Sequence, residues 1–153
     1  IEKNKFTKQM AFNVIPHIDT FVENGNTKEE EKMVNETKKI LDQGIKVSAT
    51  CVRVPVIRCH SESINIEFDQ NPNIEKISKL INNYPGITVL DNIHTNTYPT
   101  PVFGEGKEDV YVGRLRKDIS NENAINLWAV SDNLVKGAAL NAIQILEEFQ
   151  KIG

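Results

Sequence analysis

The sequence contains few of the residues that mark specialised protein classes. Only two of its 153 residues are cysteines, too few for the disulfide framework of a small secreted domain. No apolar run approaches the roughly 20 residues that a membrane span requires, and the polar start has no apolar signal core. The formal net charge of -3 offers no basic surface for nucleic acid or anionic lipid. These absences favour a cytoplasmic protein whose partners are neither nucleic acid nor membrane.

Motifs for nucleotides, metals and nucleophilic thiols are also absent. There is no G-x-G-x-x-G, so the chain has no dinucleotide-binding fingerprint. His17 and His94 have no cysteine or aspartate at metal-ligand spacing, which argues against a metal site. Cys51 and Cys59 lack the neighbouring base or helix start that would make a thiolate, and are interpreted as buried or edge-strand thiols. The chain also starts at Ile1 rather than methionine, which suggests that an upstream part has been removed.

The residues that are present suffice for one packed domain over residues 1–153. Hydrophobic residues make up 39% of the chain and charged residues 25%, which excludes a disordered protein. Thr27 and Glu30 form a capping-box pattern that predicts a helix to about Gln43. A second helix is predicted after Asn71-Pro72, and a third from Ser131 or Asp132 to about Gln150. Strands are predicted over residues 10–22 with a bend at Pro16, 47–58, 60–68, 87–90, 110–116 and 124–130, with a polar loop over 94–109.

Several strands follow one another without a helix between them, which favours antiparallel pairing. The predicted fold class is therefore α+β, with a mixed, largely antiparallel sheet and helices packed on one face. The last predicted helix is apolar over more than one face, from Leu134 to Phe149. Because such a helix needs cover on more than one side, we expect another domain or subunit to pack against it.

One cluster of chemically capable residues lies in the second and third predicted strands. Arg53 can hold a carboxylate or phosphate with two hydrogen bonds. His60 is suited to proton transfer near neutral pH, and Glu62 could orient it. On spacing alone, an edge-strand ion pair or a hydrogen-bonded surface histidine is the more common explanation.

A second cluster lies on the first predicted helix. Glu29, Lys32 and Glu36 share one side at spacings of three and four residues. Glu29 could receive an ammonium group, and Lys32 a phosphate or carboxylate. On spacing alone, a solvated face with weak salt bridges is the more common explanation.

In several segments the sequence resembles the aspartate-semialdehyde dehydrogenases. The resemblance covers nearly the whole chain in order, and it is specific because these segments occur together. They are Phe12-Asn13-Val14-Ile15-Pro16-His17-Ile18, Glu36-Thr37-Lys38-Lys39-Ile40, Val47 to Pro55, Arg53 to Glu62, and Asp132-Asn133-Leu134-Val135-Lys136-Gly137-Ala138-Ala139.

The resemblance implies one half of a two-domain enzyme that reversibly reduces aspartyl phosphate with NADPH, giving aspartate semialdehyde and phosphate. That reaction feeds lysine, threonine, methionine and diaminopimelate synthesis. In this family His60 corresponds to the acid/base residue, Arg53 to the substrate-carboxylate grip, and Lys32 to the phosphate-binding residue. Glu29 corresponds to the ammonium-binding acid, its register taken among Glu29, Glu30 and Glu31. Asn133 corresponds to a residue that touches the nicotinamide cofactor.

The resemblance also implies what this chain does not carry. The family's nucleophilic cysteine lies in a Ser-x-Asn-Cys segment that neither Cys51 nor Cys59 matches, and the NADP-binding domain is expected upstream of Ile1. The fold is expected to be similar to the C-terminal domain of glyceraldehyde-3-phosphate dehydrogenase, with an exposed sheet face that builds a homodimer. The chain alone is then expected to be inactive. The alternatives are a stand-alone, non-catalytic dimerisation or ligand-binding module and a reductase of N-acetylglutamyl phosphate, whose acetylated amine carries no charge for Glu29.

Overall fold

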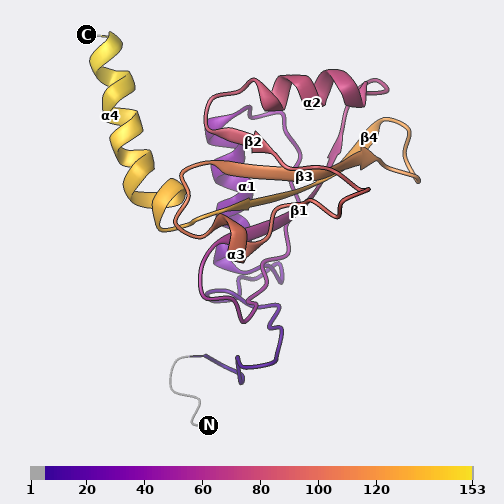
Figure 1. Cartoon of the computed structure of the whole chain (residues 1–153). Coiled ribbons are helices and arrows are strands. Elements are labelled where there is room, and N and C mark those ends of the chain that lie inside the picture. The colour runs from indigo at the N-terminus through magenta and orange to yellow at the C-terminus, as the bar shows by residue number, and fades with distance from the viewer. Residues whose placement is uncertain (1–5, 153) are drawn as a thin grey trace. The chain divides into compact units, whose positions relative to one another are not determined.

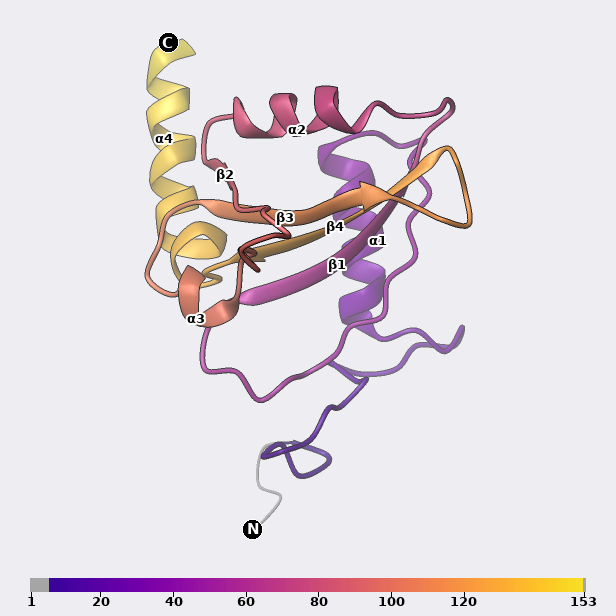
Figure 2. The same ribbon diagram turned by 45° about the vertical axis from the view of Figure 1, so that its right-hand side comes forward.

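A computed structural model of the chain describes residues 6–152, which divide into two compact units at Pro55 and Val56 (Figures 1 and 2). The first unit contains helix α1 (Lys28–Ile40). The helices of the second unit are α2 (Ile74–Asn82), α3 (Pro101–Gly104) and α4 (Leu140–Ile152), and the π-helical turn η1 (Val135–Ala139) precedes α4. Its strands are β1 (His60–Glu67), β2 (Ile87–Val89), β3 (Val110–Lys117) and β4 (Ala124–Ser131).

The four strands form one sheet in the order β1-β4-β3-β2. Strand β4 runs antiparallel to both β1 and β3, whereas β2 runs parallel to β3. Helix α2 packs along β2 and β3 (Figure 2). The expected α+β class, with a mixed and largely antiparallel sheet, is therefore confirmed.

The core of the second unit is centred on β4. Ile125 and Val130 are each 1% exposed, and residues at odd spacing on a strand point to opposite faces. Both faces of β4 are therefore covered at these positions. Gly104 of α3 lies against Val130, where an added Cβ would approach the valine Cγ1 to 3.1 Å. The close fit brings the 94–104 segment onto the sheet at the end of β4.

Helix α1 begins as the sequence predicts. The Thr27 hydroxyl accepts a hydrogen bond from the Glu30 backbone N–H at 3.3 Å, and the Glu30 carboxylate accepts one from the Thr27 N–H at 2.7 Å. These bonds satisfy two donors that the first turn would otherwise leave unpaired. The helix ends at Ile40, earlier than the predicted Gln43, and Leu41 is its C-cap, with its N–H donating to the Thr37 carbonyl.

The predicted strands over residues 10–22 and 47–58 are wrong. These segments contain isolated bridges, of which one pairs Ile15 with Arg53 in both directions at 3.0 and 2.8 Å. Pro16 and Pro55 flank this bridge and have no N–H to donate, so a regular ladder does not continue.

Two smaller expectations also need correction. The predicted loop over 94–109 contains α3, because the Thr100 hydroxyl caps the Phe103 N–H and Pro101 occupies the first turn. Helix α2 is capped by Asn73, not Asn71: the Asn73 side chain accepts from the Lys76 N–H at 2.9 Å.

The last helix extends away from the sheet (Figures 1 and 2). Its apolar side chains are largely in solvent: Ile145 is 61% exposed, Leu146 57% and Phe149 73%. The expectation that α4 needs an additional partner remains a prediction, and the exposure of these side chains is its motive.

Candidate active site

The residues singled out from the sequence divide between the two units. Glu29, Lys32 and Arg53 belong to the first unit, and His60 and Asn133 to the second.

In the first unit, Glu29 and Lys32 lie one turn apart on α1. The Lys32 ammonium is 3.6 Å from a Glu29 carboxylate oxygen, and the two side chains are 55% and 33% exposed. An exposed pair of this kind contributes little to stability. Both charged groups are therefore accessible to a ligand that would replace either partner.

The three consecutive glutamates have different surroundings. Glu30 is buried and caps the helix, and its other oxygen accepts from the Cys51 backbone N–H at 2.8 Å. Glu31 accepts from the side-chain amides of Asn24 and Asn26 at 2.8 and 2.7 Å. Glu29 instead meets the Lys32 ammonium. Of the three, Glu29 is the one paired with a lysine, and its role as the ammonium-binding acid stays a prediction.

Arg53 is half-buried in an extended segment of the first unit. Its backbone is fixed by the two hydrogen bonds to Ile15, and its guanidinium lies over the Phe6 ring at 5.3 Å. Two residues earlier, the Cys51 N–H donates to Glu30. The segment that carries Arg53 is thus joined to the start of α1 through a carboxylate.

In the second unit, His60 is the first residue of β1 and is exposed. Its strand partner is Ser131, the last residue of β4. Glu62 follows two positions later on the same side of β1 and is also exposed. The structure therefore presents the imidazole at the end of an edge strand, where a substrate could reach it.

Cys59 directly precedes His60 and is held from two directions. Its N–H donates to the Asn133 side-chain oxygen at 3.0 Å, and its thiol donates to the Pro101 carbonyl at 3.3 Å. Its backbone has a φ of 74°, a left-handed conformation that residues other than glycine rarely adopt. Asn133 is therefore connected to His60 through the residue before it.

The Cys59 thiol is poorly suited to act as a nucleophile. It is 6% exposed, and burial together with the negative charges of Asp132 and Glu105 raises its pKa above the usual range. A raised pKa disfavours the thiolate that nucleophilic attack requires. This agrees with its interpretation as a buried thiol.

From the sequence, Asp132 was predicted only as one of two candidate caps of the last helix. It is fully buried and accepts backbone hydrogen bonds from Gly106 and Leu134, both at 2.8 Å. These bonds lower the pKa of its carboxyl, and Arg58 lies 3.9 Å away. An acidic residue directly after an apolar strand and before Asn133 was the signal available in the sequence.

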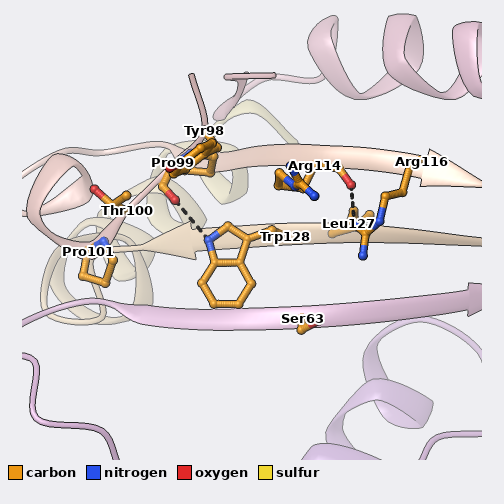
Figure 3. A pocket seen from close by; sticks show the side chains of 9 residues that line it. All are labelled: Ser63, Tyr98, Pro99, Thr100, Pro101, Arg114, Arg116, Leu127 and Trp128. Carbon is orange, nitrogen blue, oxygen red and sulfur yellow. Dashed lines mark hydrogen bonds between the residues drawn. The ribbon is translucent and has the colours of Figure 1, made fainter. Parts of the chain in front are cut away.

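An open pocket of about 450 Å³ lies on the other side of β1 (Figure 3). Trp128 stands in it, with its ring nitrogen donating to the Pro99 carbonyl at 3.0 Å. Ser63 and His60 lie at odd spacing on β1, so this pocket opens on the face opposite to the imidazole. Its lining consists of Ser63, Tyr98, Pro99, Thr100, Pro101, Arg114, Arg116, Leu127 and Trp128.

Within residues 6–152, no group of three or more histidine, cysteine or acidic side chains is arranged to hold a metal ion. No helix within the same residues is long and apolar enough to cross a membrane.

Comparison with known proteins identifies one family. A family model described as semialdehyde dehydrogenase, dimerisation domain, matches residues 1–136. Among curated proteins, aspartate-semialdehyde dehydrogenase of Aquifex aeolicus is 51% identical over 97% of this chain, and that of Bacillus subtilis 48% identical over 99%. The chain spans 44% of the length of each of these relatives.

Solved structures give the same result. Aspartate semialdehyde dehydrogenase II of Vibrio cholerae, complexed with ASA, superposes with a TM-score of 0.91 at 47% identity, covering 95% of this chain and 43% of that one. Aspartate semialdehyde dehydrogenase of Candida albicans with NADP superposes with a TM-score of 0.68 at 28% identity, covering 84% of this chain and 42% of that one.

Proposed function

The chain belongs to the semialdehyde dehydrogenase family, as its dimerisation domain, and from this premise we propose that it is the substrate-binding and dimerisation half of an aspartate-semialdehyde dehydrogenase. The proposed reaction is the reversible, NADPH-dependent reduction of aspartyl phosphate to aspartate semialdehyde and phosphate, carried out in the cytoplasm. The observation that carries the proposal is the alignment of almost the whole chain with relatives named aspartate-semialdehyde dehydrogenase.

The first unit supplies the groups that hold the substrate. Arg53 receives the substrate carboxylate, because its planar guanidinium can form two parallel hydrogen bonds with two oxygens. Glu29 receives the substrate ammonium, and Lys32 the phosphate. Their mutual ion pair in the structure supports these roles, since each is accessible and already faces a group of the opposite charge.

The second unit supplies the proton-transfer group. His60 acts as general acid and base, taking a proton from a reacting group and returning it at a later step. Its exposure supports access for the substrate, and Cys59 and Asn133 support its placement. We assign the attacking thiolate to a part of the protein outside this chain, since the Cys59 thiol is buried with a raised pKa.

Asn133 also fits a role beside the cofactor. Its side-chain oxygen is occupied by the Cys59 N–H, so its amide NH₂ group remains as a donor. A nicotinamide carboxamide oxygen would match that donor. The cofactor supplies the hydride when bound, and this chain contributes at most an orienting contact to it.

The protein works as a homodimer in this proposal, and the second copy covers the sheet face around Trp128. The family description as a dimerisation domain supports a dimer. The choice of face rests on its composition, because tryptophan, tyrosine and arginine are enriched in protein interfaces. Trp128, Tyr98, Arg114 and Arg116 all line the open pocket on this face.

The test compares this chain with the full-length protein of the gene that encodes it. Full-length protein should oxidise aspartate semialdehyde with NADP and phosphate, whereas residues 1–153 alone should not exceed a mock preparation. Full-length protein that binds a ligand but shows no NADP-dependent turnover would favour a non-catalytic module. Turnover of N-acetylglutamate semialdehyde in preference to aspartate semialdehyde would contradict the assignment of Glu29.

A further inference from the structure

We propose that Glu30 is a positioning residue that fixes the place of Arg53 relative to Glu29 and Lys32. The inference rests on the proposed function, in which these three residues hold the substrate. Glu30 itself does not touch the substrate in this proposal. It acts by joining two segments of the first unit that carry groups on which binding depends.

The two carboxylate oxygens of Glu30 connect these two segments. One oxygen accepts from the Thr27 N–H at 2.7 Å and fixes the start of α1, whose first turns carry Glu29 and Lys32. The other accepts from the Cys51 N–H at 2.8 Å, two residues before Arg53. The Glu30 side chain is therefore shared between the helix and the segment that presents the guanidinium.

The remaining chain between these segments provides no regular structure. Helix α1 ends at Ile40, and the following residues up to Thr50 form neither helix nor strand. Beyond Cys51, the two hydrogen bonds between Ile15 and Arg53 fix the arginine backbone. No helix or strand links α1 to Cys51, so the Glu30 hydrogen bond is a direct connection between the start of α1 and the segment that carries Arg53.

An ordinary helix cap would not need this arrangement. A capping box uses one hydrogen bond from the glutamate side chain to the N-cap N–H, whereas Glu30 is only 8% exposed and accepts with both oxygens. The ionised Glu30 carboxylate is the form that accepts both hydrogen bonds, and these two backbone hydrogen bonds lower the pKa of the Glu30 carboxyl. Two accepting oxygens are required, and a glutamine offers one.

The experiment uses the full-length protein with three variants. Glu30→Gln removes one acceptor. Glu30→Asp keeps a carboxylate for the helix start but is one methylene too short to reach Cys51 as well. Glu31→Gln is the matched control, because it removes the same charge one position along and keeps the oxygen that accepts from Asn24 and Asn26.

For both Glu30 variants we expect the KM for aspartate semialdehyde to rise about 10- to 100-fold, since a displacement of about 1 Å can cost that much. The KM values for NADP and phosphate should stay within about twofold, because Arg53 contacts neither in this proposal and both variants keep an oxygen for the Thr27 N–H at the start of the helix that carries Lys32. Glu31→Gln should resemble the wild type in all three constants. Thermal melts of each variant accompany the kinetics.

Three results would overturn the inference. The first is a semialdehyde KM within about threefold of wild type in both Glu30 variants. The second is a parallel rise of all three KM values, which would mean general loosening of the fold. The third is an equal effect of Glu31→Gln, which would mean that net charge matters and not position. If Glu30→Gln does not fold, Glu30→Asp alone is judged by the same criteria; a wild-type protein without activity would instead refute the proposed function.

Discussion

Replacing Asn133 with alanine removes the acceptor that holds the residue before His60. In the structure the Asn133 oxygen accepts from the Cys59 N–H at 3.0 Å, across 74 residues of sequence. Cys59 is 6% exposed, so water cannot readily replace the lost oxygen. Asn133→Asp is the informative companion, because it keeps an oxygen at this position and replaces the NH₂ group with a second, charged oxygen.

The size of the effect follows from the cost of a buried donor without a partner. That cost is about 1–3 kcal/mol, so the local opening that exposes the Cys59 amide becomes roughly 5- to 150-fold more populated. The left-handed backbone of Cys59 adds to the tendency to open, since this conformation is held by its surroundings. The asparagine-to-aspartate change should alter the population far less, because a charged acceptor still receives the N–H.

The measurement is amide hydrogen exchange by mass spectrometry on a peptide that contains Cys59 and His60. Exchange in Asn133→Ala should accelerate by the factor given above, and in Asn133→Asp it should remain near wild type. Asn71→Ala is the control: it also removes a side-chain acceptor, but for the exposed Lys117 ammonium, and should not alter this peptide. Unchanged exchange at Cys59 in Asn133→Ala would refute the reasoning that this side chain holds the start of β1.

Further predictions concern the proposed site and the dimer. His60→Ala in the full-length protein should lower kcat by about 100- to 10,000-fold and flatten one limb of the pH–rate profile; turnover within about twofold of wild type would end its assignment as acid/base. Arg53→Lys should raise the semialdehyde KM and lower kcat together, because lysine keeps the charge and loses the planar fork; unchanged kinetics would point to a structural role. Ser63→Arg should shift the light-scattering mass from dimer to monomer, while Glu62→Arg, on the opposite face of β1, should leave the protein dimeric. A Ser63→Arg protein that stays dimeric would show that the interface lies elsewhere.

Elements with strong local signals were predicted correctly from the sequence. The capping box of α1 and the alternating pattern of β1 depend on residues close together in the chain, and both agree with the structure. The segments over 10–22 and 47–58 are rich in β-branched residues, but a strand also needs a partner along its length. The prolines beside Ile15 and Arg53 limit their pairing to one bridge, which composition alone did not reveal.

The candidate site shows the same division. Glu30 was predicted as a helix cap, and this is confirmed, but its second contact is with Cys51, 21 residues away. Asn133 was predicted through family resemblance, and its contact with Cys59 could not be found from spacing because it depends on how β4 returns beside β1. Local chemistry is readable in the sequence, whereas contacts between distant segments require the folded chain.

The placement of β1 at an edge of the sheet determines when His60 reaches its position during folding. Strands β3 and β4 are consecutive and joined by a short turn, so their pairing closes a small loop. In the chain, α2, β2 and β3 lie between β1 and β4. Pairing β1 with β4 therefore closes a longer loop, which costs more conformational entropy. The central pair thus forms a template to which β1 is added. We therefore expect His60 to become fixed in a late step of folding, after the central pair has formed.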